Sequence, residues 1–297
     1  MFGKVSSRGF LALALIAAAA LVAGCSHIPG LHHGRAKPKI AYEERPVDQL
    51  YLAGAQKLDA HRWNDAVDYF DEVERQHPYS EWARRSILME AYAYYEANNY
   101  DDAISTADRF IQLYPGNTQT SYAYYLKSIC YFEQIMDVQR DQGATANALV
   151  QLRQVTERYP HTDYAEDARL KIDMVNDQLA GKEMSVGRWY LRNSQPLAAE
   201  GRFKDVIDKY QTTSHTPEAL YRLVETDLTM GLTDEARRNA SVLGYNYPGD
   251  RWYSDAYNLM ARNGMRLDTP PNPKGKRGRG ERRYDPKKKS ALQPKDS

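Results

Sequence analysis

Through most of residues 46–264, apolar and polar positions alternate with the period of an α-helix. Five segments share one arrangement, in which an alanine is followed four and seven residues later by apolar side chains and eleven residues later by an aromatic or imidazole ring. Because positions i, i+4 and i+7 lie on one face of a helix, each segment predicts an amphipathic helix that turns this face toward a core. The five alanines are Ala66, Ala103, Ala148, Ala199 and Ala236, spaced by 37, 45, 51 and 37 residues.

The ring in each segment marks the predicted end of the helix. Proline follows the ring in four segments, as in Tyr114-Pro115, and proline cannot continue a helix; Gln211 stands in this place after Tyr210. A second, antiparallel helix is predicted before each alanine, because a small residue twelve positions earlier lets two helices pack closely. This small residue is present in three repeats as Gly54, Ala91 and Gly187.

The two longer spacings predict where the repeats depart from this plan. Eight extra residues in the third repeat, around 135–144, are polar and predict a loop. Fourteen extra residues within 163–183 keep helical spacing, which predicts one long helix joining repeats one to three (46–180) to repeats four and five (181–264). The sequence thus predicts an all-α solenoid of about ten helices without strands. The spacing is similar to that of the tetratricopeptide repeat, whose period of about 34 residues is lengthened here.

The amino terminus has the pattern of a secretory signal followed by a lipid anchor. Lys4 and Arg8 precede an apolar run over 10–23, which is shorter than the roughly 20 residues of a membrane-spanning helix. The run ends in Leu-Val-Ala-Gly-Cys and is similar to a bacterial lipobox, so residues 1–24 are predicted to be a signal peptide and Cys25 to carry acyl chains. An ordinary signal with a coincidental cysteine is the alternative. The similarity to lipoproteins implies that Ser26 favours the outer membrane.

Charge divides the chain into three parts, although its formal net charge is only +1. Residues 1–24 carry +2, residues 25–264 carry −8 and residues 265–297 carry +7. Residues 25–45, rich in Gly, Pro and His, are predicted to form a flexible tether. The last segment sets Lys and Arg among Gly, Pro and Ser, which predicts a disordered basic tail. Anionic lipid, an acidic partner and the acidic body of this chain are its candidate ligands; a solvated tail without a function is the alternative, and nucleic acid is not expected.

No motif of catalytic chemistry is present in the sequence. It lacks His-Glu-x-x-His, Gly-x-Ser-x-Gly, a phosphate-binding loop and Ser-x-x-Lys. Paired carboxylates such as Asp101-Asp102 fit the solvated first turn of a helix. Once Cys25 is acylated, Cys130 is the remaining thiol, and its apolar surroundings in the sequence predict a buried side chain. We therefore expect neither an enzyme nor a metal or cofactor site.

Aromatic residues of the early repeats predict a surface for binding peptides. The chain holds 23 Tyr against 6 Phe, and tyrosine gives a wide contact area with a polar tip and few rotors to freeze. The similarity to tetratricopeptide repeats implies that the first helix of each repeat lines a groove. Packing of several of these rings between helices is the alternative. The predicted groove residues are Tyr51, Leu88, Tyr92, Tyr95, Tyr122, Tyr125 and Phe132.

The segment 179–248 carries a more specific resemblance. It contains LAGKEMSVGRWY from residue 179, AEGRF from 199, EALYRLVE from 218 and LGYNYP from 243. Together with the lipobox and repeats, it resembles the BamD (ComL) family over about residues 20–262. The resemblance implies a lipoprotein on the periplasmic face of the outer membrane, a subunit of the machinery that folds and inserts β-barrel proteins. It further implies that repeats one to three receive unfolded barrel proteins, while repeats four and five dock the periplasmic domain of the barrel subunit BamA and small accessory lipoproteins.

Two arginines are the predicted docking residues, Arg188 and Arg202, the latter beside the predicted core residue Phe203. Arg202 could equally be a surface residue paired with Asp205 or Glu200. The alternative function is a general repeat scaffold of the cell envelope that coordinates wall synthesis with division; such a protein would lack the specific segment 179–248. The resemblance does not explain the tail after about residue 264.

Overall fold

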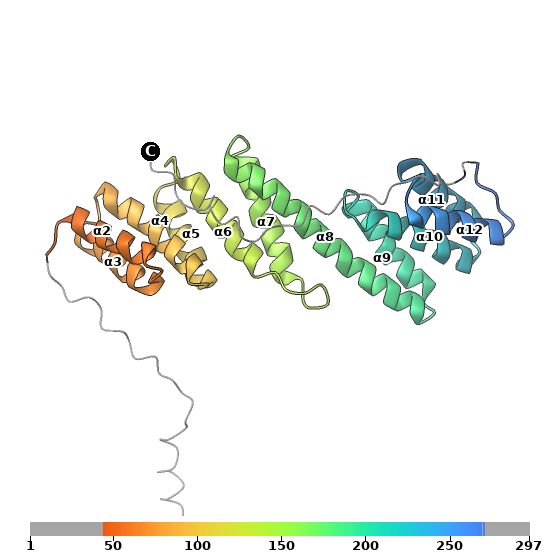
Figure 1. Cartoon of the computed structure of the whole chain (residues 1–297), viewed down its shortest axis with the longest axis horizontal. Coiled ribbons are helices and arrows are strands. Elements are labelled where there is room, and N and C mark those ends of the chain that lie inside the picture. The colour runs from red at the N-terminus through yellow and green to blue at the C-terminus, as the bar shows by residue number, and fades with distance from the viewer. Residues whose placement is uncertain (1–43, 269, 271–297) are drawn as a thin grey trace, which may run out of the picture. The chain divides into compact units, whose positions relative to one another are not determined.

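The computed structural model describes residues 44–268 and 270, and this part of the chain forms eleven α-helices and no strand. Ten helices pair into five consecutive hairpins, and one further helix follows (Figure 1). The pairs are α2 (Val47–Asp59) with α3 (Trp63–Gln76), α4 (Glu81–Glu96) with α5 (Tyr100–Leu113), α6 (Thr120–Glu133) with α7 (Gly143–Arg158), α8 (Asp163–Arg192) with α9 (Pro196–Lys209) and α10 (Thr216–Met230) with α11 (Thr233–Asn246). The predicted all-α fold of five repeats is confirmed, and α12 (Arg251–Arg262) is one helix more than the repeats require.

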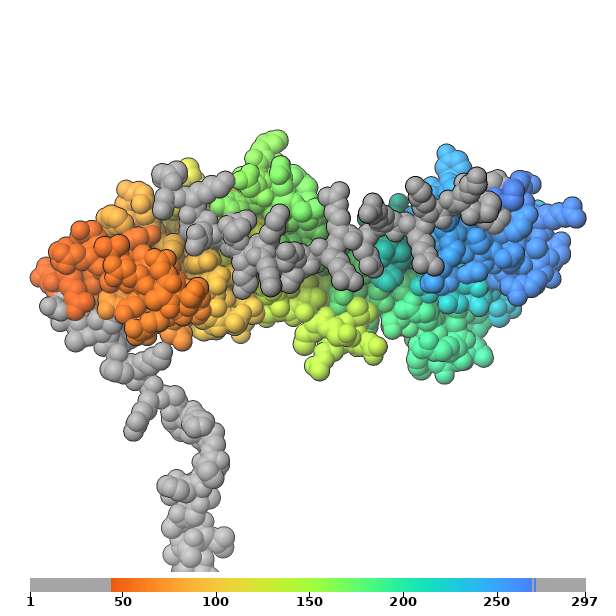
Figure 2. Space-filling view, viewed as in Figure 1, coloured from red at the N-terminus to blue at the C-terminus, as the bar shows by residue number. Residues whose placement is uncertain are grey.

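Successive repeats pack side by side in chain order (Figure 2). The last helix, α12, covers α10 and α11 with the buried side chains of Tyr253 and Met260 and so closes the apolar face of the fifth repeat. None of the helices in residues 44–268 has both the length and the apolar content that crossing a membrane requires. The predicted signal peptide, Cys25, nearly all of the tether and most of the basic tail lie outside the described residues.

The second helix of every repeat ends in the same backbone conformation. The ring residue adopts φ between −130° and −133° and ψ between 39° and 55°, and its N–H donates to the carbonyl four residues earlier. Tyr210 has this conformation although no proline follows it, so the end of the helix does not depend on the proline. The five rings are His77, Tyr114, Tyr159, Tyr210 and Tyr247.

The helix α8 is continuous over 30 residues, as the spacing predicts. It packs against α7 and α9, and its Val175 belongs to the core of repeats two and three while its Met184 belongs to the core of repeat four. The predicted polar insertion is a loop over 134–142. Gln178 and Lys182 of α8 donate hydrogen bonds to carbonyls of this loop at 2.8 and 3.1 Å, so the loop is held against the middle of α8.

Candidate functional site

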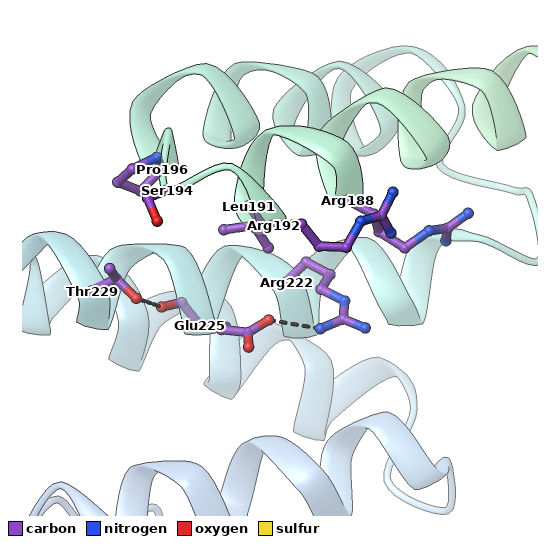
Figure 3. Close-up of a pocket in the computed structure, with 8 residues that line it drawn as sticks. All are labelled: Arg188, Leu191, Arg192, Ser194, Pro196, Arg222, Glu225 and Thr229. Atoms are coloured by element: carbon purple, nitrogen blue, oxygen red, sulfur yellow. Dashed lines mark hydrogen bonds and ion pairs between the residues drawn. The ribbon is translucent and has the colours of Figure 1, made fainter.

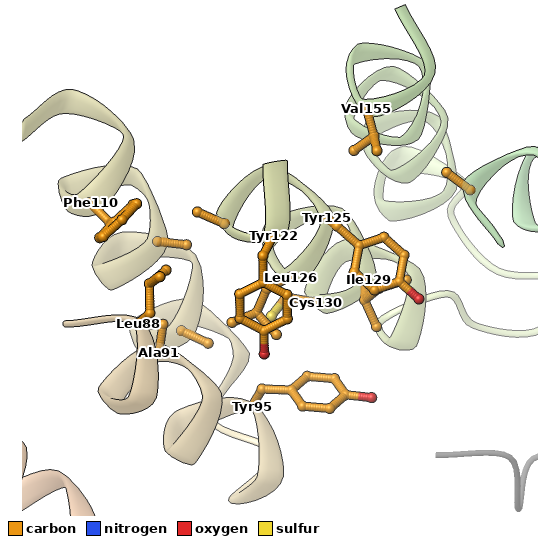
Figure 4. Packing of buried hydrophobic residues seen from close by; sticks show 14 of the residues in the cluster. Leu88, Ala91, Tyr95, Phe110, Tyr122, Tyr125, Leu126, Ile129, Cys130 and Val155 are labelled. Atoms are coloured by element: carbon orange, nitrogen blue, oxygen red, sulfur yellow. The ribbon is translucent and has the colours of Figure 1, made fainter. Parts of the chain in front are cut away.

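The structure separates the predicted groove residues into two groups. The buried group packs between α4, α6 and their neighbours (Figure 4), with exposed fractions of 2–4%. Its members are Leu88, Tyr95, Tyr122 and Tyr125. The prediction that these four line an open groove is wrong, because the first helix of the next repeat covers them, and the alternative of a core role holds. The half-buried group is Tyr51, Tyr92 and Phe132.

Tyr125 shows how the core accommodates a phenol. Its ring lies against that of Tyr164 with centroids 5.1 Å apart, and its hydroxyl donates to Asp167 Oδ2 at 2.6 Å. The apolar part of the ring is thus buried between α6 and α8 while the polar tip meets a carboxylate at the edge. Part of the tyrosine excess therefore serves contacts between repeats.

A half-buried stripe on α4 is a more open surface, and of its members only Tyr92 is among the predicted groove residues. We call it the α4 stripe, and its members recur at helical spacing as Trp82, Arg85, Met89, Tyr92 and Glu96. Tyr51 of α2 adjoins it, because its ring lies 4.9 Å from that of Trp82, and the Arg85 guanidinium lies 5.7 Å from the Trp82 ring. The spacing of Trp82 and Tyr92 along one helix face is the signal that could have identified it.

A cleft of about 580 Å³ lies between α8 and α10 (Figure 3). The first helices of neighbouring repeats approach each other closely from α2 to α8, and α10 approaches α12 in the same way, but α8 and α10 stand farther apart. Side chains from both helices and from the turn after α8 line the gap: Arg188, Leu191, Arg192, Ser194, Pro196, Arg222, Glu225 and Thr229. We call this the α8–α10 cleft.

Two of the three arginines in the cleft are held by carboxylates of α10. Arg188 donates to both oxygens of Glu218 at 3.1 Å, which joins α8 to α10 across the gap. Arg222 donates to Glu225 at 2.7 Å and lies 3.4 Å from Glu218. Its guanidinium also lies over the rings of Tyr221 and Trp252, which stack on each other with centroids 5.2 Å apart.

Arg202 lies outside this cleft. Its Nη1 donates to Glu183 Oε2 of α8 at 3.0 Å. The predicted alternatives for its partner are wrong, since Glu200 and Asp205 form ion pairs with Lys204 and Lys209 at 2.5 and 2.7 Å. The two predicted docking residues therefore bind different carboxylates and do not form one site: Arg188 joins α8 to α10, and Arg202 joins α9 to α8.

Candidate metal ligands and one thiol are the groups in the described residues that bear on chemistry. In this part of the chain, no group of three or more His, Cys, Asp or Glu side chains is placed to hold a metal ion. Cys130 is buried as expected, and burial raises the pKa of its thiol to about 12. Because the thiolate is the reactive form of cysteine, Cys130 is a packing residue.

Comparison with known proteins decides the family. Residues 43–243 match the model of the YfiO family, described as outer membrane lipoprotein. The outer membrane protein assembly factor BamD of Caulobacter vibrioides is 62% identical over 289 residues, which cover 97% of this chain and 92% of that protein. This chain belongs to the BamD family. A second BamD protein, from Rickettsia prowazekii, is 46% identical over 215 residues, covering 72% of this chain and 86% of that protein. The resemblance inferred from the sequence to the BamD family is therefore confirmed.

Solved structures of other helical-repeat proteins are similar to this BamD-family chain in fold alone. A tetratricopeptide-repeat protein of Thermus thermophilus is 18% identical with a TM-score of 0.32, covering 73% of this chain and 98% of that one. The TPR2AB domain of yeast Sti1 is 12% identical with a TM-score of 0.39, covering 73% and 85%.

Proposed function

We propose that this chain is a lipid-anchored, non-catalytic adaptor in the machinery that assembles outer-membrane proteins, placed on the periplasmic face. The observation that carries the proposal is the 62% identity to a BamD assembly factor along 97% of the chain. Two further features support it. The lipobox ending in Cys25 supplies the anchor, and a stack of helical hairpins offers long surfaces for binding other proteins.

The α4 stripe is the proposed surface for unfolded β-barrel proteins. The half-buried rings of Tyr51, Trp82 and Tyr92 are partly open to solvent, and Phe132 adds another ring from α6. Such rings stack on the aromatic side chains that end barrel strands, and they lose little entropy on binding because their packing already holds them.

Repeats four and five are the proposed docking region for the periplasmic domain of a BamA-type barrel subunit and for accessory lipoproteins. Arg188 and Arg202 support this role, since both guanidinium groups are fixed by carboxylates and remain partly exposed, at 33% and 41% of the side chain. A partly exposed arginine with a fixed orientation can share its remaining donors with a partner.

Depletion of the chain from cells tests the assembly function. Mature outer-membrane barrel proteins should fall generally, because their insertion lacks this subunit. Unchanged barrel levels together with a defect in cell-wall synthesis or division would instead support a general envelope scaffold. For the anchor, labelled palmitate should be incorporated into the wild-type chain and not into Cys25→Ala; equal labelling of both chains would contradict acylation at Cys25.

Peptide binding tests the α4 stripe. A fluorescent peptide that ends in an aromatic residue should bind the full mature chain. Trp82→Ala should weaken binding by about tenfold or more, since truncation of a central aromatic residue of an interface costs about 2 kcal/mol or more. Tyr79→Ala is the matched control, because Tyr79 is a fully exposed aromatic residue two positions before α4. Equal affinities of the two variants would contradict the proposed surface.

A further inference from the structure

The α8–α10 cleft contains one cation that the described part of the chain does not neutralise. Two carboxylates, Glu218 and Glu225, are engaged by Arg188 and Arg222. Arg192 is exposed, and its side chain has no ion pair or hydrogen bond with another described residue. Residues 46–264 carry a net charge of −10, so the unpaired Arg192 gives the cleft a positive charge on an acidic body.

The rest of the cleft is held in place for binding. Arg222 is fixed between the stacked rings of Tyr221 and Trp252 on one side and Glu225 on the other. Arg188 is fixed because its Nη1 donates to both carboxylate oxygens of Glu218. Figure 3 shows Arg188 and Arg192 on α8 and Arg222 on the facing helix α10. Groups that are already ordered lose little conformational entropy when a ligand arrives, so this arrangement favours binding.

Arg192 lies between two hollows, and apolar residues line both of them. Within the cleft, Leu191 and Pro196 lie near the turn after α8. Arg192 also borders a second hollow of about 440 Å³, in which Trp189 and Val186 are exposed or half-buried. Half of the Trp189 side chain is open to solvent. A ligand that reaches Arg192 therefore meets an aromatic ring and aliphatic groups as well as charge.

We propose that the α8–α10 cleft recognises a carboxylate side chain of a partner protein, within an acidic segment that also carries an apolar residue. The carboxylate pairs with Arg192, and the apolar residue packs on Trp189. This inference rests on the proposed docking role of repeats four and five and names the chemistry of the docked segment. A single carboxylate matches the single unpaired cation, whereas a phosphate dianion would bring a second negative charge without a partner beside Glu225, which lines the cleft.

Short peptides test the proposal on the acylated, full mature chain in detergent. The probe is an acetylated and amidated peptide with a Glu-Leu-Glu centre, and the matched peptide has Gln-Leu-Gln in its place. The Glu peptide should bind at least about tenfold more tightly, with an affinity that falls as salt rises. Arg192→Gln should abolish this preference, and Arg192→Lys should keep part of it. Arg237→Gln is the control, since Arg237 is an exposed arginine on α11.

Three results would overturn the inference. Equal binding of the Glu and Gln peptides is the first, and a preference that survives Arg192→Gln is the second. The third is Arg192-dependent binding of inorganic phosphate or of phosphatidylglycerol vesicles in preference to the Glu peptide, which would assign the cleft to phosphate groups instead. Co-purification of the wild-type chain with the barrel subunit separates this inference from the proposed function. Absence of the barrel subunit would contradict the docking role, while an Arg192-dependent preference for the Glu peptide would still support carboxylate recognition.

Discussion

The Phe203 ring of α9 lies against Gly187 of α8 so closely that a β-carbon at residue 187 would stand 2.5 Å from the ring atom Cε1. Phe203 is fully buried. The first repeat has the same arrangement, where a β-carbon at Gly54 would stand 2.7 Å from Cε1 of Phe70. The glycine therefore sets the distance between the two helices of a repeat, and the phenylalanine fills the space that it leaves.

Gly187→Ala should destabilise the chain. Alanine favours a helix over glycine by about 1 kcal/mol, but the added methyl group overlaps a buried ring, and overpacking of this kind costs about 1–3 kcal/mol. Because backbone or ring must shift in a close-packed core, we expect a net loss of up to about 2 kcal/mol in the free energy of unfolding. Urea denaturation followed by circular dichroism measures it.

Gly201→Ala is the matched control for this substitution. Gly201 lies in α9, in the same repeat, but a β-carbon there would meet no heavy atom within 4 Å. The propensity gain then stands alone, and stability should rise by up to about 1 kcal/mol. If both alanine variants shift stability in the same direction, contact with Phe203 is not what Gly187 provides.

The sequence predicts the parts of the fold that a single repeat determines. Along the sequence, Gly187 lies twelve residues before Ala199 and Phe203 lies four residues after it. The ring of Tyr210 marks the end of the helix. Short-range sequence spacing is therefore enough to identify these residues. The burial of Tyr122 depends on something else, the placement of Tyr164 from the next repeat, 5.7 Å away. Helical periodicity identifies a face and does not show which neighbouring repeat covers it.

The candidate sites also differ in whether one repeat or the packing of two repeats determines them. The sequence predicts that Arg188 docks a partner. The carboxylate that it binds within the chain belongs to Glu218, which lies 30 residues later on a helix of the next repeat. The α8–α10 cleft exists because α8 and α10 stand apart, and this separation is a property of packing in three dimensions. By contrast, Trp82 and Tyr92 share one face of one helix, so helical periodicity alone can identify the α4 stripe.

Tyr125→Phe should weaken the contact between repeats three and four without creating a cavity. The substitution removes the hydroxyl that donates to Asp167 at 2.6 Å. Asp167 keeps its ion pair with Lys171 at 2.8 Å, so we expect a loss of about 1–2 kcal/mol in the free energy of unfolding. Urea denaturation measures it beside Tyr79→Phe, which alters a fully exposed phenol and should change nothing. A Tyr125→Phe chain as stable as wild type would show that the hydrogen bond contributes little.

Cys130 should react with maleimide only when the chain unfolds. Its side chain is fully buried in the core of repeats two and three, and burial raises the pKa of the thiol to about 12. Near pH 7 the group is therefore neither accessible nor ionised to the thiolate. A Cys25→Ser chain leaves Cys130 as its one cysteine. Labelling detected by mass spectrometry should be absent in buffer and complete in urea. Rapid labelling in buffer would show that α6 opens locally.

Glu90 should give the first two repeats a specific dependence on pH. Its carboxylate is buried on α4 and accepts from Arg109 at 2.8 Å, while Arg109 also binds Glu74 at 2.5 Å. Burial raises the pKa of the Glu90 carboxyl to about 7 against the attraction of Arg109, and the nearby charges of Asp71 and Glu74 contribute to the rise. The folded chain therefore holds a proton that the unfolded chain releases near pH 4.5.

The sign of the effect follows from this difference in proton binding. The contribution of Glu90 to stability is complete below about pH 4.5 and is lost as pH rises to about 7, by on the order of 3 kcal/mol in total. Glu90→Gln cannot titrate, so the stability of wild type relative to this variant should fall between about pH 4.5 and pH 7. Urea denaturation of both chains at each pH measures the change. The other titratable groups are present in both chains, so the difference between the two profiles reports Glu90. Parallel pH profiles for the two chains would show that Glu90 is ionised throughout this range and that Arg109 outweighs burial.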